Sequence, residues 1–225
     1  MRRWLPRVPL GVGMLAALAA PAAAQQAGAR VELHPRVGAY LPERASALDP
    51  NVQLGVQVLY ALTPAVRVGF EVAGTRTVTR PRFFRPAALD FGTRIELFDV
   101  QQEVDALHYV LQAGLAPGGG TLQPYLTVGA GGYTLFLGGE SNQRLARVSG
   151  TQLAAAGGLA FRVNERSGIT LELRDYLLLD YDQEALNPVR PRSRDTVFYE
   201  RWPRSPAPKD QVHVLAVGLG FTYHP

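Results

Sequence analysis

The sequence predicts an all-β fold, an eight-stranded antiparallel up-and-down transmembrane β-barrel. Three observations lead to this prediction. Apolar side chains recur at every second position in several short segments, which is the period of a β-strand. The connections between these segments alternate between short and long, and the face opposite the apolar side chains is rich in Gly, Ala and polar residues.

The longest stretch of the mature chain without a charged residue, 106–139, does not have the pattern of a spanning helix. It contains Pro117, three consecutive glycines and Pro124. Proline interrupts helices, and a helical span needs about 20 apolar residues in a row. We therefore expect strands, and not helices, to cross the membrane.

The first residues have the pattern of a secretory signal. Three arginines precede an apolar stretch over 8–20, and the small-residue sequence 21–24 follows. We therefore expect a signal peptide over residues 1–24, cleaved near Ala24, and one barrel domain over residues 25–225. These arginines account for most of the formal net charge of +4, so the charge of the mature chain does not indicate a nucleic-acid partner.

The first four strands are expected at 31–41, 52–61, 66–75 and 107–115. In each of them the residues of one parity are mostly large and apolar, whereas those of the other parity are mostly small or polar. The apolar parity comprises Val31, Leu33, Val37, Ala39 and Leu41; Val52, Leu54, Val56, Val58 and Tyr60; Val66, Val68, Phe70 and Val72; and Leu107, Tyr109, Leu111, Ala113 and Leu115.

The last four strands are expected at 125–131, 152–163, 169–174 and 213–223. Glycine and alanine are especially frequent on their polar face, as in Gly129, Gly158 and Gly218. The opposite parity comprises Leu126, Val128 and Ala130; Leu153, Ala155, Leu159, Phe161 and Val163; Ile169, Leu171 and Leu173; and His213, Leu215, Val217, Leu219, Phe221 and Tyr223.

Alternation alone does not say which face of the barrel is outside, because a soluble lipocalin-like barrel also alternates. The small residues of the polar face suit the narrow interior of a barrel, whereas the Val, Leu and Phe face suits lipid. The chain has a single lysine, Lys209, although soluble barrels keep a charged, lysine-rich exterior. Asp175 is an exception, since its parity places it on the lipid face; a bulge, or a strand already leaving the bilayer, would explain it.

The connections have the asymmetry of an outer-membrane barrel, with tight periplasmic turns and long external loops, and both termini are then expected in the periplasm. The short connections are 63–65, 117–120 and 164–167, and the long ones are 42–51, 80–103, 138–150 and 180–211. A ten-stranded barrel stays open as an alternative, because 94–102 and 196–201 could pair as further strands. Four outward aromatic residues near the short turns predict an interfacial girdle, namely Tyr60, Phe161, Phe221 and Tyr223.

At the level of whole segments, the chain resembles the small eight-stranded outer-membrane barrels related to OmpA, OmpX and OmpW. The resemblance covers the mature chain and rests on Pro35–Tyr40, Pro124–Gly131, Leu171–Tyr176 and Val217–Tyr223. It implies a location in the bacterial outer membrane, contact with its lipids, and insertion by the barrel-assembly machinery. In such families that machinery reads an aromatic residue at the end of the last strand; here Tyr223 is followed by two more residues.

Seven charged residues fall on the Gly/Ala face and are expected to point into the barrel, namely Glu32, Arg36, Arg67, Glu71, Arg162, Glu172 and Arg174. Those nearest the middle of their strands are Arg36, Glu71, Glu172 and Arg174. Because buried charges must be paired or solvated, we predict that these four form an ion-pair and hydrogen-bond network across the lumen. Eight strands leave room only for side chains, so the network is expected to plug the barrel; a gate or narrow pore is the alternative.

The four histidines do not form a metal-binding pattern. His34 and His108 point inward by parity, but no ligand spacing supports a closed site, so neither a metal nor a cofactor is expected. His213 points outward near one end of the last strand, where a lipid-modifying enzyme could place a histidine. The serine nearest to it in sequence is Ser205, in the preceding loop, so a deacylase lacks its nucleophile–base pair and an enzyme is not expected.

The long connections contain many arginines, among them the closely spaced Arg190, Arg192 and Arg194. Arginine binds phosphate well, and lipopolysaccharide phosphates are the nearest anions at the cell surface. These three residues are therefore candidate lipopolysaccharide contacts. The alternative is a solvated loop stiffened by proline.

Together, these patterns predict a non-enzymatic outer-membrane barrel with a structural or surface-interaction role and a polar, plugged lumen. Two alternatives stay open, a narrow channel for small solutes and a soluble lipocalin-like ligand-binding barrel. The sequence does not indicate a ligand, an organism or an oligomeric state.

Overall fold

The structure is a computed structural model that describes residues 31–84, 87–90, 95–99, 101–117, 120–138, 147–164, 166–187 and 209–223. Within 87–90 and 95–98 it describes the backbone alone. The predicted signal peptide over 1–24 lies outside the described residues and stays a prediction.

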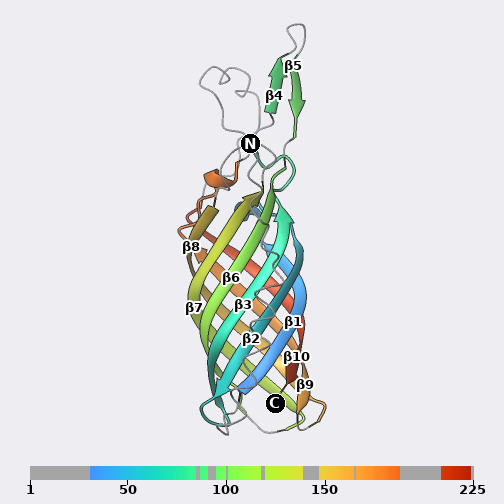
Figure 1. Ribbon diagram of the computed structural model, residues 1–225, viewed down its shortest axis with the longest axis vertical. Coiled ribbons are helices and arrows are strands. Elements are labelled where there is room, and N and C mark those ends of the chain that lie inside the picture. The colour runs from blue at the N-terminus through green and yellow to red at the C-terminus, as the bar shows by residue number, and fades with distance from the viewer. Residues whose placement is uncertain are drawn as a thin grey trace, which may run out of the picture.

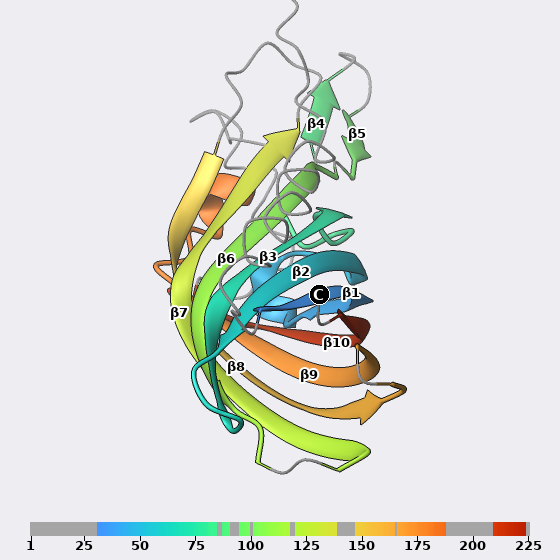
Figure 2. The same ribbon diagram turned by 60° about the horizontal axis from the view of Figure 1, so that its bottom comes forward.

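Eight strands close into an antiparallel barrel, with neighbours in the order β1-β10-β9-β8-β7-β6-β3-β2 (Figure 1). The barrel strands are β1 (Val31–Pro42), β2 (Asn51–Ala61), β3 (Val66–Val78), β6 (Glu103–Leu115), β7 (Leu122–Gly138), β8 (Arg147–Arg162), β9 (Ser167–Leu179) and β10 (Gln211–Tyr223). Figure 2 brings the end with the short connections forward and shows the strands wrapping around one lumen. The predicted fold class, an eight-stranded up-and-down barrel, is confirmed.

Two short strands lie apart from the barrel. β4 (Ala87–Asp90) pairs with β5 (Ile95–Phe98) as a separate two-stranded sheet in the connection between β3 and β6. In Figure 1 this hairpin extends beyond the end of the barrel that carries the long connections. The hairpin therefore adds no strand to the barrel, and 196–201, proposed as its partner in a ten-stranded barrel, lies outside the described residues.

The two described helices are single 3-10 turns in the long connections, η1 (Arg44–Ser46) and η2 (Glu184–Leu186). Among the residues that the structure describes, no helix has the length and apolar character needed to span a membrane.

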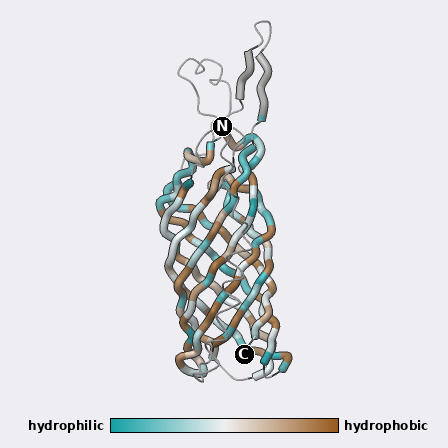
Figure 3. Tube along the Cα trace, in the orientation of Figure 1, coloured by the Kyte–Doolittle hydropathy of each residue, from teal (hydrophilic) through white to brown (hydrophobic). Residues whose placement is uncertain are grey.

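The outer face of the barrel is apolar, as the alternation predicts. Large side chains point away from the lumen along every strand, and Leu111, Leu126 and Val128 are 68%, 66% and 64% exposed. Along the barrel strands in Figure 3, apolar and polar residues alternate. Because a water-soluble barrel places its apolar side chains inside, this exterior is suited to lipid.

The lumen differs in character between its two ends. Towards the long connections it is filled by an apolar core with several tyrosines, including Tyr40, Val104, Leu135, Leu178 and Val212, all 0% exposed. Residues of the long connections complete this core, namely Leu48, Phe83, Phe84, Tyr181 and Leu186. The expected polar lumen is therefore only part of the interior, because inward Val, Leu and Tyr side chains replace Gly, Ala and polar residues near this end.

Candidate functional site

The four charged residues predicted to meet in the lumen lie together in the middle of the barrel. Arg36 of β1 forms ion pairs with Glu71 of β3 and with Glu172 of β9. Arg174 of β9 forms ion pairs with the same two carboxylates, at 2.7 Å from Glu71 and 2.9 Å from Glu172. Each arginine thus contacts both glutamates, and the four groups form a closed ring of alternating charge, which we call the charged layer.

Because the four charges are buried, each of them depends on its partners in the ring for compensation. The side chains of Glu71 and Arg174 are 0% and 1% exposed, and those of Glu172 and Arg36 are 7% and 10% exposed. Burying a single ion costs several kcal/mol even after relaxation, and a good partner offsets this cost. Two arginines and two glutamates make the ring formally neutral, so each charge is compensated within the layer.

Side chains of β2, β7 and β9 donate further hydrogen bonds to the carboxylates. The Tyr176 hydroxyl donates to Glu71, and the Tyr125 hydroxyl donates to Glu172 at 3.0 Å. Gln57 Nε2 lies 3.3 Å from an oxygen of each glutamate. On the opposite side, Arg174 Nη1 donates to Gln112 Oε1 at 3.0 Å.

Sequence reasoning did not single out these four supporting residues, Gln57, Gln112, Tyr125 and Tyr176. Their inward parity was a usable signal, but parity does not say which inward residues of different strands lie at the same level. That level depends on the register between strands, which the alternation of one strand does not reveal.

Two glycines provide room for the side chains of Tyr125 and Arg36, in and next to the charged layer. A Cβ on Gly158 would lie 2.5 Å from the Tyr125 ring and hydroxyl, and one on Gly55 would lie 2.9 Å from Arg36 Nε. Both glycines are on neighbouring strands at the level of the side chain that covers them. The glycine-rich inner face thus creates room for long polar side chains in a narrow barrel.

Above the charged layer, His108 joins the polar residues to the apolar core. Its ring stacks on Tyr176 with centroids 4.6 Å apart, and its Nδ1 lies 2.8 Å from Gln152 Oε1. His34, the other inward histidine, contacts Glu32 and Thr222 instead. The described part of the chain contains no group of three or more metal-ligating side chains.

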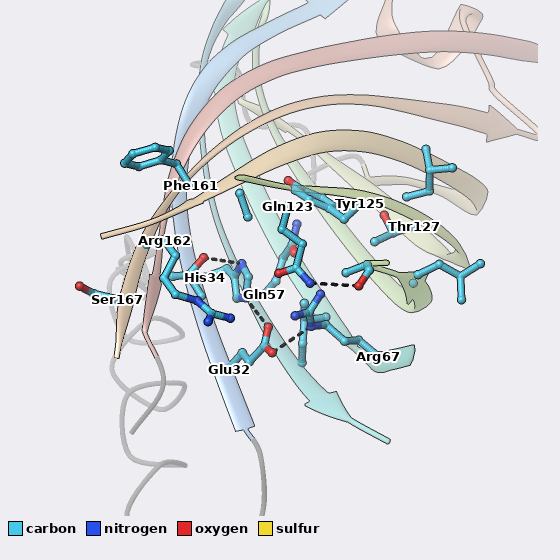
Figure 4. A pocket seen from close by; sticks show the side chains of 18 of the residues that line it. Glu32, His34, Gln57, Arg67, Gln123, Tyr125, Thr127, Phe161, Arg162 and Ser167 are labelled. Atoms are coloured by element: carbon cyan, nitrogen blue, oxygen red, sulfur yellow. Dashed lines mark hydrogen bonds and ion pairs between the residues drawn. The ribbon is translucent and has the colours of Figure 1, made fainter. Parts of the chain in front are cut away.

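Below the charged layer, towards the short connections, the lumen opens into a cavity of about 60 Å³, which we call the vestibule. Arg67 Nε donates to Glu32 Oε1 at 2.9 Å, and His34 Nε2 lies 3.2 Å from Glu32 Oε2. Figure 4 shows these side chains around the hollow, with Gln123 and Arg162 also directed towards it. Sequence reasoning placed Glu32, Arg67 and Arg162 on the inner face but did not group them as a cavity.

No protein-family model and no curated protein matches this sequence. Among solved structures, Neisserial surface protein A has a TM-score of 0.50 at 8% identity, covering 87% of this chain and 96% of that chain. The outer membrane protein OprG from Pseudomonas aeruginosa has a TM-score of 0.50 at 15% identity, covering 88% of this chain and 97% of that one. The fold is that of the small eight-stranded outer-membrane barrels. At these identities the likeness concerns the fold alone.

On the outer surface of the barrel, His213 is paired with an aspartate of the neighbouring strand. His213 Nδ1 lies 2.8 Å from Asp175 Oδ2, and both side chains point outward, 55% and 37% exposed. The pairing of β9 continues without interruption through Asp175 on both sides, opposite Leu215 and Ala155. A bulge therefore does not explain the outward Asp175, which hydrogen-bonds to His213 on the neighbouring strand.

The candidate lipopolysaccharide contacts Arg190, Arg192 and Arg194 lie outside the described residues, as does Ser205. The structure therefore describes the lumen charges and three of the four histidines that the sequence singled out, and not the arginine-rich segment 190–194 or His224.

Proposed function

We propose that this protein is a bacterial outer-membrane barrel with a closed lumen, and that it acts without catalysis through its structure and its external loops. The observation that carries the proposal is the filling of the lumen at two successive levels, by the charged layer and by the apolar core above it.

The charged layer opposes the passage of ions through the lumen. A permeating ion would have to separate Arg174 from Glu71 and Glu172, and would leave buried charges without partners. Above this level the ion would meet apolar side chains such as Val104 and Leu135, which do not replace its hydration. These two obstacles favour a plugged barrel over a narrow channel.

The aromatic residues of the outer surface support the proposal that the barrel lies in a lipid bilayer. The predicted aromatic girdle, Tyr60, Phe161, Phe221 and Tyr223, is exposed on the outer face at the end with the short connections. Aromatic residues prefer the membrane–water interface. With the short connections in the periplasm, the long connections and the β4–β5 hairpin face the cell exterior.

Planar-bilayer recordings test the closed lumen. The purified wild-type protein is expected to give no reproducible single-channel conductance, and Glu172→Ala is the variant that weakens the plug. Stable, uniform conductance steps from the wild-type protein would overturn the proposal. Glu103→Ala, at the exposed start of β6, is the matched control for loss of a carboxylate outside the lumen.

Membrane fractionation and heat-modifiable migration in detergent gels test the location separately. An outer-membrane barrel is expected in the outer-membrane fraction and migrates differently before and after boiling. Recovery in the soluble fraction, without a shift on heating, would favour the lipocalin-like alternative.

We also propose that the external arginine cluster Arg190, Arg192 and Arg194 contacts lipopolysaccharide, since arginine pairs with phosphate through two parallel hydrogen bonds. Changing all three to Glu is expected to weaken binding of purified lipopolysaccharide. The control is Arg166→Glu, in a short turn at the opposite end. Unchanged binding in the triple variant would remove this proposal.

A further inference from the structure

The vestibule has the chemistry of a small ligand site and not only of a solvent-filled mouth. It is lined by residues of β1, β2, β3, β6, β7, β8, β9 and β10. Two of these residues, Gln57 and Tyr125, hydrogen-bond to Glu172 of the charged layer. A smaller cavity of about 20 Å³ shares His34, Gln57 and Tyr125 with it and reaches Arg36 and Glu172. The vestibule and the charged layer are therefore adjacent along the lumen, with His34, Gln57 and Tyr125 between them.

The charges of the vestibule favour an anion. Both oxygens of Glu32 are engaged, Oε1 by Arg67 and Oε2 by His34, so this carboxylate is poorly placed to attract a cation. Arg67 makes this contact through Nε, which leaves its two Nη groups for another acceptor. Arg162 lines the same cavity and forms no ion pair within the part of the chain that the structure describes.

The formal charge of the vestibule matches a monoanion. The lining contains two arginines and one glutamate, whose formal charges sum to one positive charge. In Figure 4 the guanidinium groups of Arg67 and Arg162 extend towards the hollow from different strands. Arginine holds carboxylates in a fork of parallel N–H donors, which gives both affinity and orientation.

The apolar part of the lining and the volume of the cavity limit the part of the ligand that carries the anionic group. Leu59, Ala116 and Ala160 provide an apolar part of the lining. A water molecule needs about 10–15 Å³ of such space, so a cavity of about 60 Å³ accommodates only a few non-hydrogen atoms. This size corresponds to a short-chain acid such as acetate or propionate.

We propose that the vestibule is a binding site for a short-chain monocarboxylate, with the carboxylate on Arg67 and Arg162 and the short tail against Leu59, Ala116 and Ala160. That the site opens to the periplasm rests on the orientation proposed above. The binding itself does not rest on it, since it is measured with the purified barrel.

The test is a titration of the full-length protein in detergent micelles with sodium propionate, at constant ionic strength, followed by NMR. Gly114 and Gly168 line the vestibule, and their backbone amide signals serve as reporters. We expect their chemical shifts to change along a saturable curve with propionate, and not with propylammonium. Absence of a saturable change, or an equal response to propylammonium, would overturn the proposal.

Variants separate the site from nonspecific binding. Arg162→Gln is expected to weaken propionate binding about tenfold, as expected for loss of one charge-assisted hydrogen-bonding group. Arg67→Gln is expected to do the same, whereas Arg166→Gln, an exposed arginine at the same end that does not line the cavity, leaves the affinity unchanged. An equal affinity in all three variants contradicts the site.

Inorganic phosphate separates the contribution of the arginines from that of the apolar residues to ligand binding. It carries acceptor oxygens but no tail, so we expect it to bind more weakly than propionate. Phosphate binding as tight as that of propionate would overturn the role of the apolar wall. Arg162 is exposed at the end of β8 and forms no hydrogen bond or ion pair with the charged layer among the described residues, so the Arg162→Gln variant is expected to fold normally.

Discussion

Arg174 Nη1 and Glu71 Oε2 lie 2.7 Å apart across the lumen, and both side chains are fully buried. The two residues belong to β9 and β3, which are not neighbours in the barrel. Their contact therefore joins opposite walls of the lumen. With Arg36 and Glu172 it closes a ring in which no charge is without an opposite partner.

Removing one member of this ring is expected to destabilise the barrel strongly. Arg174→Ala leaves Glu71 and Glu172 with only Arg36 between them, and the loss of one partner of a buried pair costs about 3–5 kcal/mol. Urea unfolding of the protein in phospholipid vesicles measures this loss.

The matched control for this variant is Arg76→Ala. Arg76 pairs with Asp105 at 2.8 Å on the outside of the barrel, where both side chains are exposed. Exposed ion pairs contribute little to stability, so little change is expected. Equal losses in the two variants would contradict an energetically coupled lumen.

The space around Gly158 predicts a second effect on stability. In Gly158→Ala the new Cβ would lie 2.5 Å from Tyr125 and from the backbone oxygen of Leu171, so the strand or the ring has to move. Overpacking of this kind costs about 1–3 kcal/mol, and it disturbs the hydrogen bond from Tyr125 to Glu172. The same unfolding measurement detects it.

Gly120→Ala serves as the comparison, because the nearest atom to its Cβ is 3.8 Å away. We expect a change within about 0.5 kcal/mol there. Should Gly158→Ala be as stable as Gly120→Ala, Tyr125 would not be held against the β8 backbone as described.

If the outer face contacts lipid, the cost of placing an arginine on it depends on depth in the bilayer. Leu111 is 68% exposed in the middle of β6, so Leu111→Arg is expected to cost about 2–4 kcal/mol in a bilayer. Val163, directly after β8 at the short-connection end, is expected to tolerate Arg at a cost of about 0–1 kcal/mol. Folding into vesicles measures both, and an equal tolerance of arginine at the two positions would argue against a bilayer around β6.

A buried tyrosine in the long connection between β9 and β10 predicts that the stability of the protein depends on alkaline pH. The Tyr181 hydroxyl donates to the backbone oxygen of Ser46 at 2.6 Å, and burial raises the pKa of this hydroxyl well above its usual value. In the unfolded chain a tyrosine ionises near pH 10. Between these two pKa values the unfolded state loses a proton that the folded state keeps, so stability falls as the pH rises above about 10.

Tyr181→Phe is expected to cost about 0.5–1.5 kcal/mol at neutral pH, through the lost hydrogen bond, and to reduce the alkaline decline. Unfolding curves at neutral and alkaline pH, compared with the wild-type protein, measure both quantities. An unchanged alkaline decline would mean that other groups account for it.

Much of the fold was predictable because alternation is a local property. A residue on a strand of a lipid-embedded barrel faces either lipid or lumen, and Val52, Leu54 and Val56 alternate with Gln53 and Gly55 accordingly. The four charges of the layer were predictable for a related reason, since a charge on the inner face near mid-strand has only the lumen in which to find a partner.

The apolar upper lumen was not predictable in the same way. Val104, Leu135 and Leu178 are the same residue types as those that face lipid, so composition does not separate the two environments. Where a strand extends beyond the bilayer, its apolar side chains are no longer required to point outward, and they can pack in the lumen instead. The core at this end forms only when residues of the long connections, such as Leu48 and Leu186, fold over the strands.

The sequence by itself determined that the chain alternates between two faces over eight segments, and which face carries the charges, because side-chain direction in a strand has a period of two. Only the tertiary structure decided how those charges pair, with each of the two arginines in contact with both glutamates. Arg36, Glu71 and Arg174 come from three strands, and closure of the barrel with one particular register brings them to the same level. The same closure places Arg67 and Arg162 around one vestibule, since contacts across a lumen depend on the curvature and stagger of all eight strands together.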